Sequence, residues 1–337
     1  MAATLPIPRL SEQEGAGVFF LTDDALAQAV GVRIAFSGRA GGVSEGAYSS
    51  LNVGGHVGDA AQAVQENRRR LAEALGAAGL PLVVPKQVHG TALVDVRAAD
   101  APAVEAAQRA AGEGADGIVV SAPGVAALLC FADCVPVVVA SPTGRFAVVH
   151  AGWRGAVAHI AAKAVRALAA LDVQAGGDGE GAAGAAWPAD ALLREAGGSE
   201  ADGGSSGSGA VGAPGAEGMP AGASAASAAW PADALLREAA SAFNVYIGPC
   251  IHAECFACGP DVCAQFERAF GGEAVPEAGR VDLPRAVALD VEAAGVDARR
   301  VCDAGACTAC DAGRWFSYRA SGGVCGRHGA LAFRRTE

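Results

Sequence analysis

The sequence predicts an α+β protein with mixed sheets, built as a single domain with a low-complexity insertion. Short apolar runs alternate with amphipathic segments along most of the chain, a pattern typical of strands and helices in one fold. The 337 residues are 52% hydrophobic and 18% charged, which is enough to bury a sizeable core. Residues 176–227 instead consist mainly of Ala, Gly and Ser. We therefore expect residues 1–175 and 228–337 to form one domain around a disordered insertion.

The composition excludes several classes of function. A net charge of −11 argues against a general nucleic-acid or membrane-surface binder, since such proteins need a basic face. The longest apolar run, residues 125–140, is interrupted by Asp133 and is too short to span a bilayer. No basic region followed by an apolar core opens the chain, so we predict a cytoplasmic protein without a signal peptide. In that setting the ten cysteines favour metal binding, catalysis or burial over disulfides.

The insertion contains a local duplication. The phrase AAWPADALLREA occurs at residues 185–196 and again at 228–239, separated by a polar, Gly-rich spacer. The spacer cannot bury enough apolar surface to offset the entropy lost on ordering it. Each copy predicts a short helix with Pro188 or Pro231 in its first turn. Because patterned sequence resumes directly after the second copy, we expect that copy to belong to the fold.

The remaining elements follow from periodicity and turn residues. Asp59 is a suitable N-cap for a helix that runs to Leu75, with Val64, Asn67, Leu71 and Leu75 on one face. Apolar or alternating runs predict strands at residues 83–84, 92–96, 117–121, 126–131, 136–140, 145–149 and 245–247. Amphipathic patterns predict helices at residues 155–171, 261–270 and 284–294.

One predicted hairpin brings chemically active side chains together. If Ser-Pro-Thr-Gly at residues 141–144 is the turn, Ala140 lies opposite Arg145, and Cys134 then lies opposite Ala151, beside His150. Paired strands are about 4.8 Å apart, so the thiol and the imidazole meet at the open end of the hairpin. The pair is consistent with two metal ligands or with a Cys–His catalytic dyad. A buried cysteine beside an unrelated histidine is the alternative.

Residues around this hairpin add two further candidates. Gly-Trp-Arg-Gly at residues 152–155 leads into a predicted helix, whose free N–H groups together with Arg154 suit an anion. Arg154 is equally consistent with a loop contact or an ion pair. His89, in the loop KQVHG, is the best candidate for a third ligand, because three protein ligands plus water are typical of catalytic zinc. Spacing alone does not place His89 near Cys134.

Two Cys-x-x-Cys pairs stand near the end of the sequence. Cys255 and Cys258 form one pair, and Cys307 and Cys310 form the other, which together have the form of a four-cysteine zinc site. Predicted helix and strand elements separate the two pairs, which argues against that site. Cys302, Cys325 and His328 give weaker support to a local cluster. Whether these cysteines bind a second metal stays open.

The motifs, taken in order, resemble a known family. KQVHG, ADGIVV, FADCVPVVV, VVHAGWRG, IGPCI and WFSYR are similar to those of the bacterial laccase-like polyphenol oxidase family, also called the YfiH or peptidoglycan editing factor family. The resemblance covers about residues 31–333 apart from the insertion. It implies a layered α/β/β/α fold and a zinc-dependent purine nucleoside phosphorylase that acts on adenosine, inosine and methylthioadenosine and also deaminates adenosine. A copper-dependent phenol oxidase and a Cys–His hydrolase that edits peptidoglycan precursors are the alternatives.

The resemblance also implies site residues and partners. His89, Cys134 and His150 match the family's metal ligands, and Asp133 is predicted to orient a ligand or to transfer a proton. Zn²⁺ is the expected metal. Copper is less favoured because a blue-copper site commonly adds methionine, and the chain has only Met1 and Met219. The expected partners are purine nucleosides and phosphate, with no nucleic acid or membrane. Candidates for holding phosphate or sugar are Arg39, Asn52 and Arg154.

The sequence departs from the family pattern at two positions. Val287 stands where an asparagine is frequent, and His252 stands where a glycine is usual. We interpret the helix around Val287 as mainly structural and His252 as incidental to the site. Oligomeric state and the role of the insertion cannot be inferred from the sequence.

Overall fold

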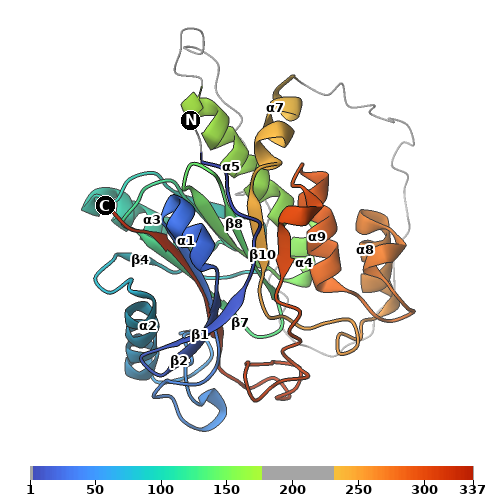
Figure 1. Cartoon of the computed structure of the whole chain (residues 1–337). Helices are drawn as coiled ribbons and strands as arrows, with labels where there is room; N and C mark the ends of the chain where they lie inside the picture. The colour runs from blue at the N-terminus through green and yellow to red at the C-terminus, as the bar shows by residue number, and fades with distance from the viewer. Residues whose placement is uncertain (1–2, 177–230, 337) are drawn as a thin grey trace.

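Two six-stranded mixed sheets form the centre of this computed structural model, which describes residues 3–176 and 231–336 (Figure 1). The strands of the first sheet, in spatial order, are β1 (Ser11–Gly15), β2 (Val18–Thr22), β3 (Val32–Ser37), β12 (His328–Arg334), β7 (Ala126–Phe131) and β4 (Leu82–Val83). Its neighbouring strands are antiparallel, except that β4 and β7 run parallel.

The second sheet carries the predicted hairpin at its centre. Its strands, in spatial order, are β11 (Val301–Asp303), β10 (Asn244–Ile247), β8 (Val135–Ala140), β9 (Phe146–Ala151), β6 (Gly117–Val120) and β5 (Leu93–Val96). The pairs β10–β11 and β5–β6 are parallel, and the other pairs are antiparallel. The class predicted from the sequence, α+β with mixed sheets, is therefore confirmed.

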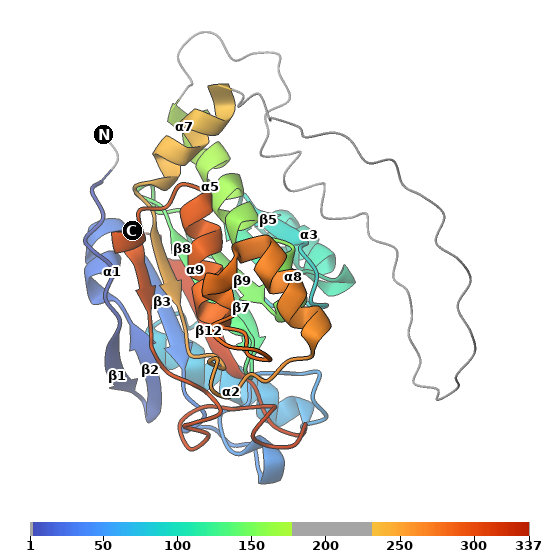
Figure 2. The ribbon, with the colours of Figure 1, turned by 90° about the vertical axis from the view of Figure 1, so that its right-hand side faces the viewer.

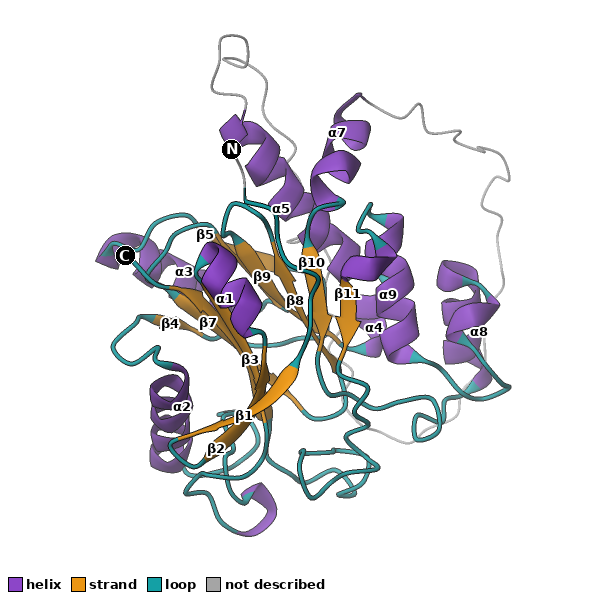
Figure 3. Ribbon diagram, in the orientation of Figure 1, coloured by secondary structure: helices purple, strands orange, loops and turns teal. Residues whose placement is uncertain are grey.

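Helices pack around the two sheets, some on their outer faces and others against the core between the sheets (Figures 2 and 3). They are α1 (Asp24–Val30), α2 (Ala61–Leu75), α3 (Ala101–Glu113), α4 (Trp153–Val157), α5 (Ile160–Gly176), α7 (Pro231–Ala240), α8 (Pro260–Phe270) and α9 (Leu283–Ala293). Short 3₁₀ turns occupy Gly46–Tyr48, Gly272–Ala274 and Ala298–Arg300.

Apolar side chains fill three interfaces between these layers. The interface between the sheets contains residues from both, such as Phe36, Phe131 and Phe146. The outer face of the first sheet packs on α2 through Leu71 and Leu75, and the outer face of the second sheet packs on α5 and α9. Strands β7, β8 and β9 are buried along their whole length, because they are covered on both faces. The order helix, sheet, sheet, helix is the one that the resemblance implied.

The start of α2 differs from the prediction. The face formed by Val64, Asn67, Leu71 and Leu75 is buried as expected. Asp59 is not the N-cap, however, because the helix begins at Ala61 and no side chain caps it. The Asp59 carboxylate instead accepts hydrogen bonds from Ser44 Oγ at 2.5 Å and Asn52 Nδ2 at 2.9 Å. A tertiary contact has therefore replaced the local cap.

The helix predicted over residues 155–171 is divided in two. α4 ends at Val157 and α5 begins at Ile160, and His159 between them has a left-handed φ of 61°. Asp290 of α9 stabilises this break. Its carboxylate accepts hydrogen bonds from His159 Nδ1 at 2.7 Å and from the backbone N–H of Ala162, at the start of α5, at 2.9 Å. The buried face of Ile160, Ala164 and Leu168 agrees with the prediction.

The duplicated segment is described in part. The second copy forms α7, as predicted, and α7 packs against α5. The first copy, residues 185–196, and nearly all of the insertion lie outside the described residues. Within the described ranges, no helix combines the length and the apolar character that crossing a bilayer requires.

Candidate metal centre

The β8–β9 hairpin forms with a register one residue away from the prediction. The N–H of Gly144 donates to the carbonyl of Ser141 at 3.0 Å, and Gly144 has a left-handed φ of 80°. A three-residue loop closed by such a glycine is a common hairpin connection, whereas the sequence analysis assumed a four-residue loop. Ala140 therefore pairs with Phe146 and not with Arg145. Cys134 immediately precedes β8 and lies opposite Gly152, one residue beyond the predicted Ala151.

Three side chains converge at the open end of this hairpin. The ligand atoms of His89, Cys134 and His150 all lie within 4.8 Å of one another. Cys134 Sγ is 3.9 Å from His89 Nε2, and the two imidazole rings meet edge to face with centroids 4.8 Å apart. Gly152 makes this approach possible, because a methyl group there would lie 2.7 Å from His89 Cδ2 and 3.4 Å from Cys134 Sγ. The structure thus brings together the three residues that the resemblance indicated.

Asp116 organises this group, although the sequence analysis gave it no role. It is fully buried immediately before β6 and accepts a hydrogen bond from His150 Nδ1 at 2.7 Å. The backbone N–H groups of Val88, His89 and Gly90 also donate to its carboxylate, at 2.7–3.2 Å. The carboxylate therefore fixes both the loop that carries His89 and the ring of His150. Because Nδ1 is occupied, Nε2 of His150 is left for a metal.

Two signals pointed to Asp116. It lies in the quoted motif ADGIVV, and it precedes a fully apolar strand. Its partner, however, depends on tertiary pairing. Because Gly117 of β6 pairs with Val149 of β9, Asp116, the residue before Gly117, lies opposite His150. That β6–β9 register cannot be inferred from the sequence of either strand.

The charges in this group favour a thiolate beside an imidazolium when no metal is bound. Burial opposes charge on both side chains, but their mutual attraction and hydrogen bonds outweigh it. The pKa of Cys134 is lowered to about 6, and the pKa of His150 is raised to about 9 with help from Asp116. The pKa of Asp116 is lowered in spite of its burial, because His150 and the backbone N–H groups stabilise the carboxylate. The group therefore favours the ionised thiol that metal binding or nucleophilic attack requires.

The three side chains open into a cavity of about 470 Å³. Its wall combines cationic, aromatic and polar groups. The lining residues are His56, Gln87, His89, Cys130, Ala132, Asp133, Cys134, His150, Ile251, Phe256, Tyr318, Arg319 and Arg327. Burial, and to a lesser degree the nearby Arg327, lower the pKa of His56. Sequence reasoning missed His56, Arg319 and Arg327. His56 lies far in the sequence from the two arginines, which come from the stretch before β12.

Asp133 lies in the cavity wall with both carboxylate oxygens engaged. Its backbone has a left-handed φ of 86°, which directs the chain from β7 into Cys134. Oδ1 accepts a hydrogen bond from Thr308 Oγ1 at 2.7 Å, and Oδ2 accepts one from the backbone N–H of Arg319 at 2.6 Å. Asp133 thereby connects the end of β7 to two loops from the C-terminal part of the chain.

Arg39, Asn52 and Arg154 are not among the lining residues of this cavity. The Arg39 guanidinium donates to the carbonyls of Ser49 and Ala312. Asn52 is fully buried, and its Oδ1 accepts a hydrogen bond at 2.8 Å from the backbone N–H of Arg327, which does line the cavity. Arg154 is exposed at the second residue of α4, with its guanidinium carbon 4.4 Å from the centroid of the Trp153 ring.

The two packed mixed sheets, with a thiol and two imidazoles gathered at one end of a hairpin, define an α+β protein with a group suited to a metal ion. The chain belongs to the family described as multi-copper polyphenol oxidoreductase laccase, whose model matches residues 33–177 and 218–335. These ranges contain His89, Cys134 and His150 as well as Asp116.

Similar proteins of known name support the same grouping. A Corynebacterium glutamicum protein named purine nucleoside phosphorylase is 41% identical over 143 residues, which are 42% of this chain and 55% of the relative. The purine nucleoside phosphorylase YlmD of Geobacillus stearothermophilus is 43% identical over 122 residues, 36% of this chain and 44% of the relative. The chain thus spans about half the length of the curated relatives it matches.

Solved structures cover more of the chain. The crystal structure of YlmD from Geobacillus stearothermophilus superimposes with a TM-score of 0.69 at 26% identity, over 98% of this chain and 100% of YlmD. The Bacillus licheniformis protein YfiH gives a TM-score of 0.66 at 21% identity, over 94% of this chain and 96% of YfiH. The second likeness shows the fold alone.

Proposed function

We propose that this chain is a zinc-dependent purine nucleoside phosphorylase that also deaminates adenosine. The observation that carries the proposal is the convergence of His89, Cys134 and His150 at a cavity that also presents Arg319 and Arg327. The group offers three metal ligands, and the arginines offer charge for an anionic co-substrate. The names of the relatives, purine nucleoside phosphorylase, support the same reaction.

The donor set fits zinc. A tetrahedron with usual Zn–S and Zn–N bond lengths has an S···N edge of about 3.6 Å. The 3.9 Å between Cys134 Sγ and His89 Nε2 is close to that edge. Blue-copper sites commonly add an axial methionine, and the described residues that line this cavity include none. When bound, zinc would supply a Lewis acid that activates water or polarises a substrate atom near neutral pH.

The remaining cavity residues suit a nucleoside and phosphate. Phe256 and Tyr318 provide aromatic faces on which a purine can stack. The Arg327 guanidinium donates hydrogen bonds to the carbonyls of Cys325 and Gly326 at 2.9 Å. These contacts restrict the conformational freedom of the charged group. We assign phosphate binding to Arg319 and Arg327, because both line the cavity.

Residues predicted to contact phosphate or to move a proton take more indirect roles in this proposal. Asn52 is a positioning residue, since it holds the backbone N–H of Arg327. Asp133 holds the backbone N–H of Arg319 and so positions the second arginine. Arg154 lies at the same end of the hairpin and keeps its predicted role in attracting phosphate as a separate hypothesis.

Product analysis tests the reaction. Protein loaded with Zn²⁺ is expected to convert adenosine and phosphate into adenine and ribose 1-phosphate, and to release inosine and ammonia from adenosine without phosphate. Cys134→Ser should lose both the metal bound at the cavity and the activity. Cys302→Ser removes a thiol outside the cavity and should retain both. Full activity in metal-free protein, or in Cys134→Ser, would contradict the proposal.

The phosphate assignment has its own measurement. Arg319→Ala and Arg327→Ala should each raise the KM for phosphate at least about tenfold, since a charge-assisted hydrogen bond contributes about 1.5–3 kcal/mol. If Arg154 attracts phosphate, Arg154→Ala should raise the same KM. If Arg154→Ala leaves the phosphate dependence unchanged, Arg154 does not attract phosphate. An unchanged KM in both other variants would remove the assignment to the cavity arginines.

A Cys–His hydrolase that acts on peptidoglycan precursors is a second candidate. The spatial arrangement of Asp116, His150 and Cys134 favours this function, because the carboxylate orients an imidazole that lies beside a thiol. Metal dependence separates the two functions. Chelated protein that cleaves such a precursor and is alkylated at Cys134 would favour the hydrolase, whereas loss of activity on chelation and its return with Zn²⁺ would favour the phosphorylase.

A further inference from the structure

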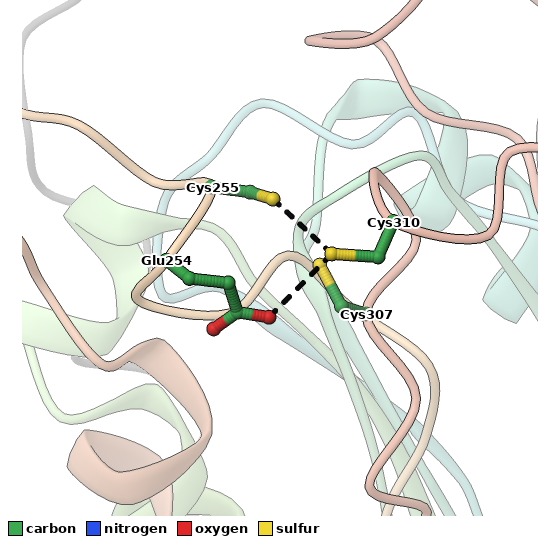
Figure 4. A group of neighbouring side chains, drawn as sticks. All are labelled: Glu254, Cys255, Cys307 and Cys310. Atoms are coloured by element: carbon green, nitrogen blue, oxygen red, sulfur yellow. Dashed lines mark hydrogen bonds between the residues drawn. The ribbon is translucent and has the colours of Figure 1, made fainter.

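A second group of soft ligands lies outside the cavity described above. Glu254, Cys255, Cys307 and Cys310 gather their side-chain ends at one point, as Figure 4 shows. Each residue offers one ligand atom, and all four atoms lie within 4.8 Å of one another. Three of the four cysteines in the two Cys-x-x-Cys motifs therefore meet, although the elements between the motifs argued against a shared site. The Cys258 thiol is directed instead to the carbonyl of Phe256, at 3.5 Å.

The spacing of these atoms matches a single coordination shell. Four ligands around zinc, at Zn–S distances near 2.3 Å and Zn–O distances near 2.0 Å, are separated by about 3.5–3.8 Å. Cys255 Sγ is 3.4 Å from Cys310 Sγ, and Cys310 Sγ is 3.7 Å from Glu254 Oε1 (Figure 4). The arrangement therefore needs only small side-chain movements to enclose one ion.

Two loops that follow neighbouring strands hold the group in place. Glu254 and Cys255 lie in the loop after β10, and Cys307 and Cys310 lie in the loop after β11. Cys250 and Cys307 form a parallel bridge that keeps the loops together, and the N–H of Thr308 donates to the carbonyl of Cys250 at 2.9 Å. The backbone scaffold on both sides is thus fixed by contacts that do not depend on an ion.

One backbone contact suits a ligating sulfur, and the group is open to solvent. The backbone N–H of His252 points at Cys307 Sγ from 3.5 Å, the kind of contact that stabilises a ligating sulfur. Cys307 is buried, whereas Cys310 and Glu254 are exposed. An ion can therefore reach the group from solvent while one ligand anchors it in the fold.

We propose that Glu254, Cys255, Cys307 and Cys310 bind a second zinc ion, in a structural site distinct from the cavity. Three thiolates and one carboxylate complete a tetrahedral shell, and a shell closed by four protein ligands is the pattern of structural zinc. Binding releases the thiol protons to solvent as the Zn–S bonds form, so no oxidant or reductant takes part. The mostly sulfur donor set selects zinc over Mg²⁺ and Ca²⁺, which prefer oxygen ligands.

This ion would reinforce the wall of the first site. Thr308, between Cys307 and Cys310 in the chain, donates to the Asp133 carboxylate at 2.7 Å. Phe256, next to Cys255, lines the cavity. A zinc ion that ties the two loops would therefore restrain the contacts on Asp133 and Phe256. The proposal stands on the ligand geometry and does not require the proposed function.

Metal counting on the full chain tests the proposal. Protein purified with a thiol reductant, saturated with Zn²⁺ and desalted should hold two zinc ions per chain. Cys310→Ser should hold one, and it should fold normally because Cys310 is exposed and outside the apolar core. Cys134→Ser should also hold one ion, and the double variant none. Cys258→Ser, a matched change at the one cysteine of the two Cys-x-x-Cys motifs that lies outside the group, should hold two.

The outcomes separate the two sites. Cobalt-loaded Cys134→Ser should show thiolate-to-cobalt charge-transfer absorption that disappears when Cys310→Ser is added. If Cys134→Ser holds no metal after reduction, or Cys310→Ser holds as much as wild type, the second site is refuted. A Cys255–Cys310 disulfide that persists under reductant and blocks zinc would equally overturn the proposal. Lack of nucleoside activity with two bound zinc ions would refute the proposed function alone.

Discussion

Replacing Asp116 with asparagine should weaken metal binding at the candidate centre, although all three ligand residues remain. One carboxylate oxygen accepts hydrogen bonds from His150 Nδ1 and the His89 N–H, and the other accepts them from the N–H groups of Val88 and Gly90. Asparagine has a single acceptor oxygen. Whichever way the amide points, its NH₂ group must face two donors, so one pair of hydrogen bonds is lost.

The size of the effect follows from these contacts. A buried donor left unsatisfied costs about 1–3 kcal/mol, and the Val88 N–H is near solvent, so we expect the protein to lose about 2 kcal/mol of stability. If the amide instead presents NH₂ to His150, the ring must accept at Nδ1 and carry its proton on Nε2, which blocks metal binding. Loss of such a supporting partner lowers metal affinity by about 10–100-fold.

Zinc competition with a chromophoric chelator and urea unfolding measure the two effects separately. Asp290→Asn is the matched control, because Asp290 is also a buried carboxylate that accepts from a histidine and a backbone N–H but does not line the cavity. It should lose stability and keep the zinc affinity of the wild type. If Asp116→Asn binds zinc as tightly as the wild type, or if both variants lose affinity equally, the role assigned to Asp116 is wrong.

Three further predictions concern other parts of the chain. Gly152→Ala should lower zinc affinity in the same competition assay, because the new methyl group would lie 2.7 Å from His89 Cδ2 and must displace that ring; unchanged affinity would contradict the close packing. The hydrogen bond to Asp290 raises the pKa of His159 above 6.5. The stability that it contributes is therefore present in full below pH 6.5 and is lost as the pH rises through the folded-state pKa. Because the ring is half exposed, the effect should stay below about 1 kcal/mol, and His159→Gln should abolish this pH dependence of urea unfolding. Deleting residues 176–227 should leave nucleoside activity intact, and failure of the shortened chain to fold would refute the predicted domain boundaries.

Local sequence patterns predicted those elements whose structure is decided locally. The strand at residues 126–131 has the predicted bounds, because a continuous apolar run is typical of a strand covered on both faces. The helix ending at Leu75 was predicted from its apolar face, but its cap was not, since Asp59 is bound by Ser44 and Asn52. A side chain that has both a local and a distant partner available cannot be assigned from spacing alone.

The same distinction between local and distant contacts applies to the candidate site. Cys134 and His150 are joined by one hairpin, so turn placement predicted their proximity even though the register was one residue off. His89 was indicated only by family resemblance, and Asp116 received no role. Both depend on the β6–β9 pairing, which joins segments far apart in sequence. Arg327 reaches the cavity through Asn52, a contact that spans most of the chain and leaves no local pattern.

The place of β12 in the first sheet has a consequence for biosynthesis. β12 lies between β3 and β7 and hydrogen-bonds to both, although it follows them by most of the chain. While a ribosome is still making the intervening residues, β3 and β7 each present an open edge that only β12 can fill. Such edges attract other strands, so a nascent chain stalled before β12 would be prone to aggregation and a natural client of chaperones. Because β12 is the last of the described strands in sequence order, the first sheet can close only after every other described strand has been synthesised.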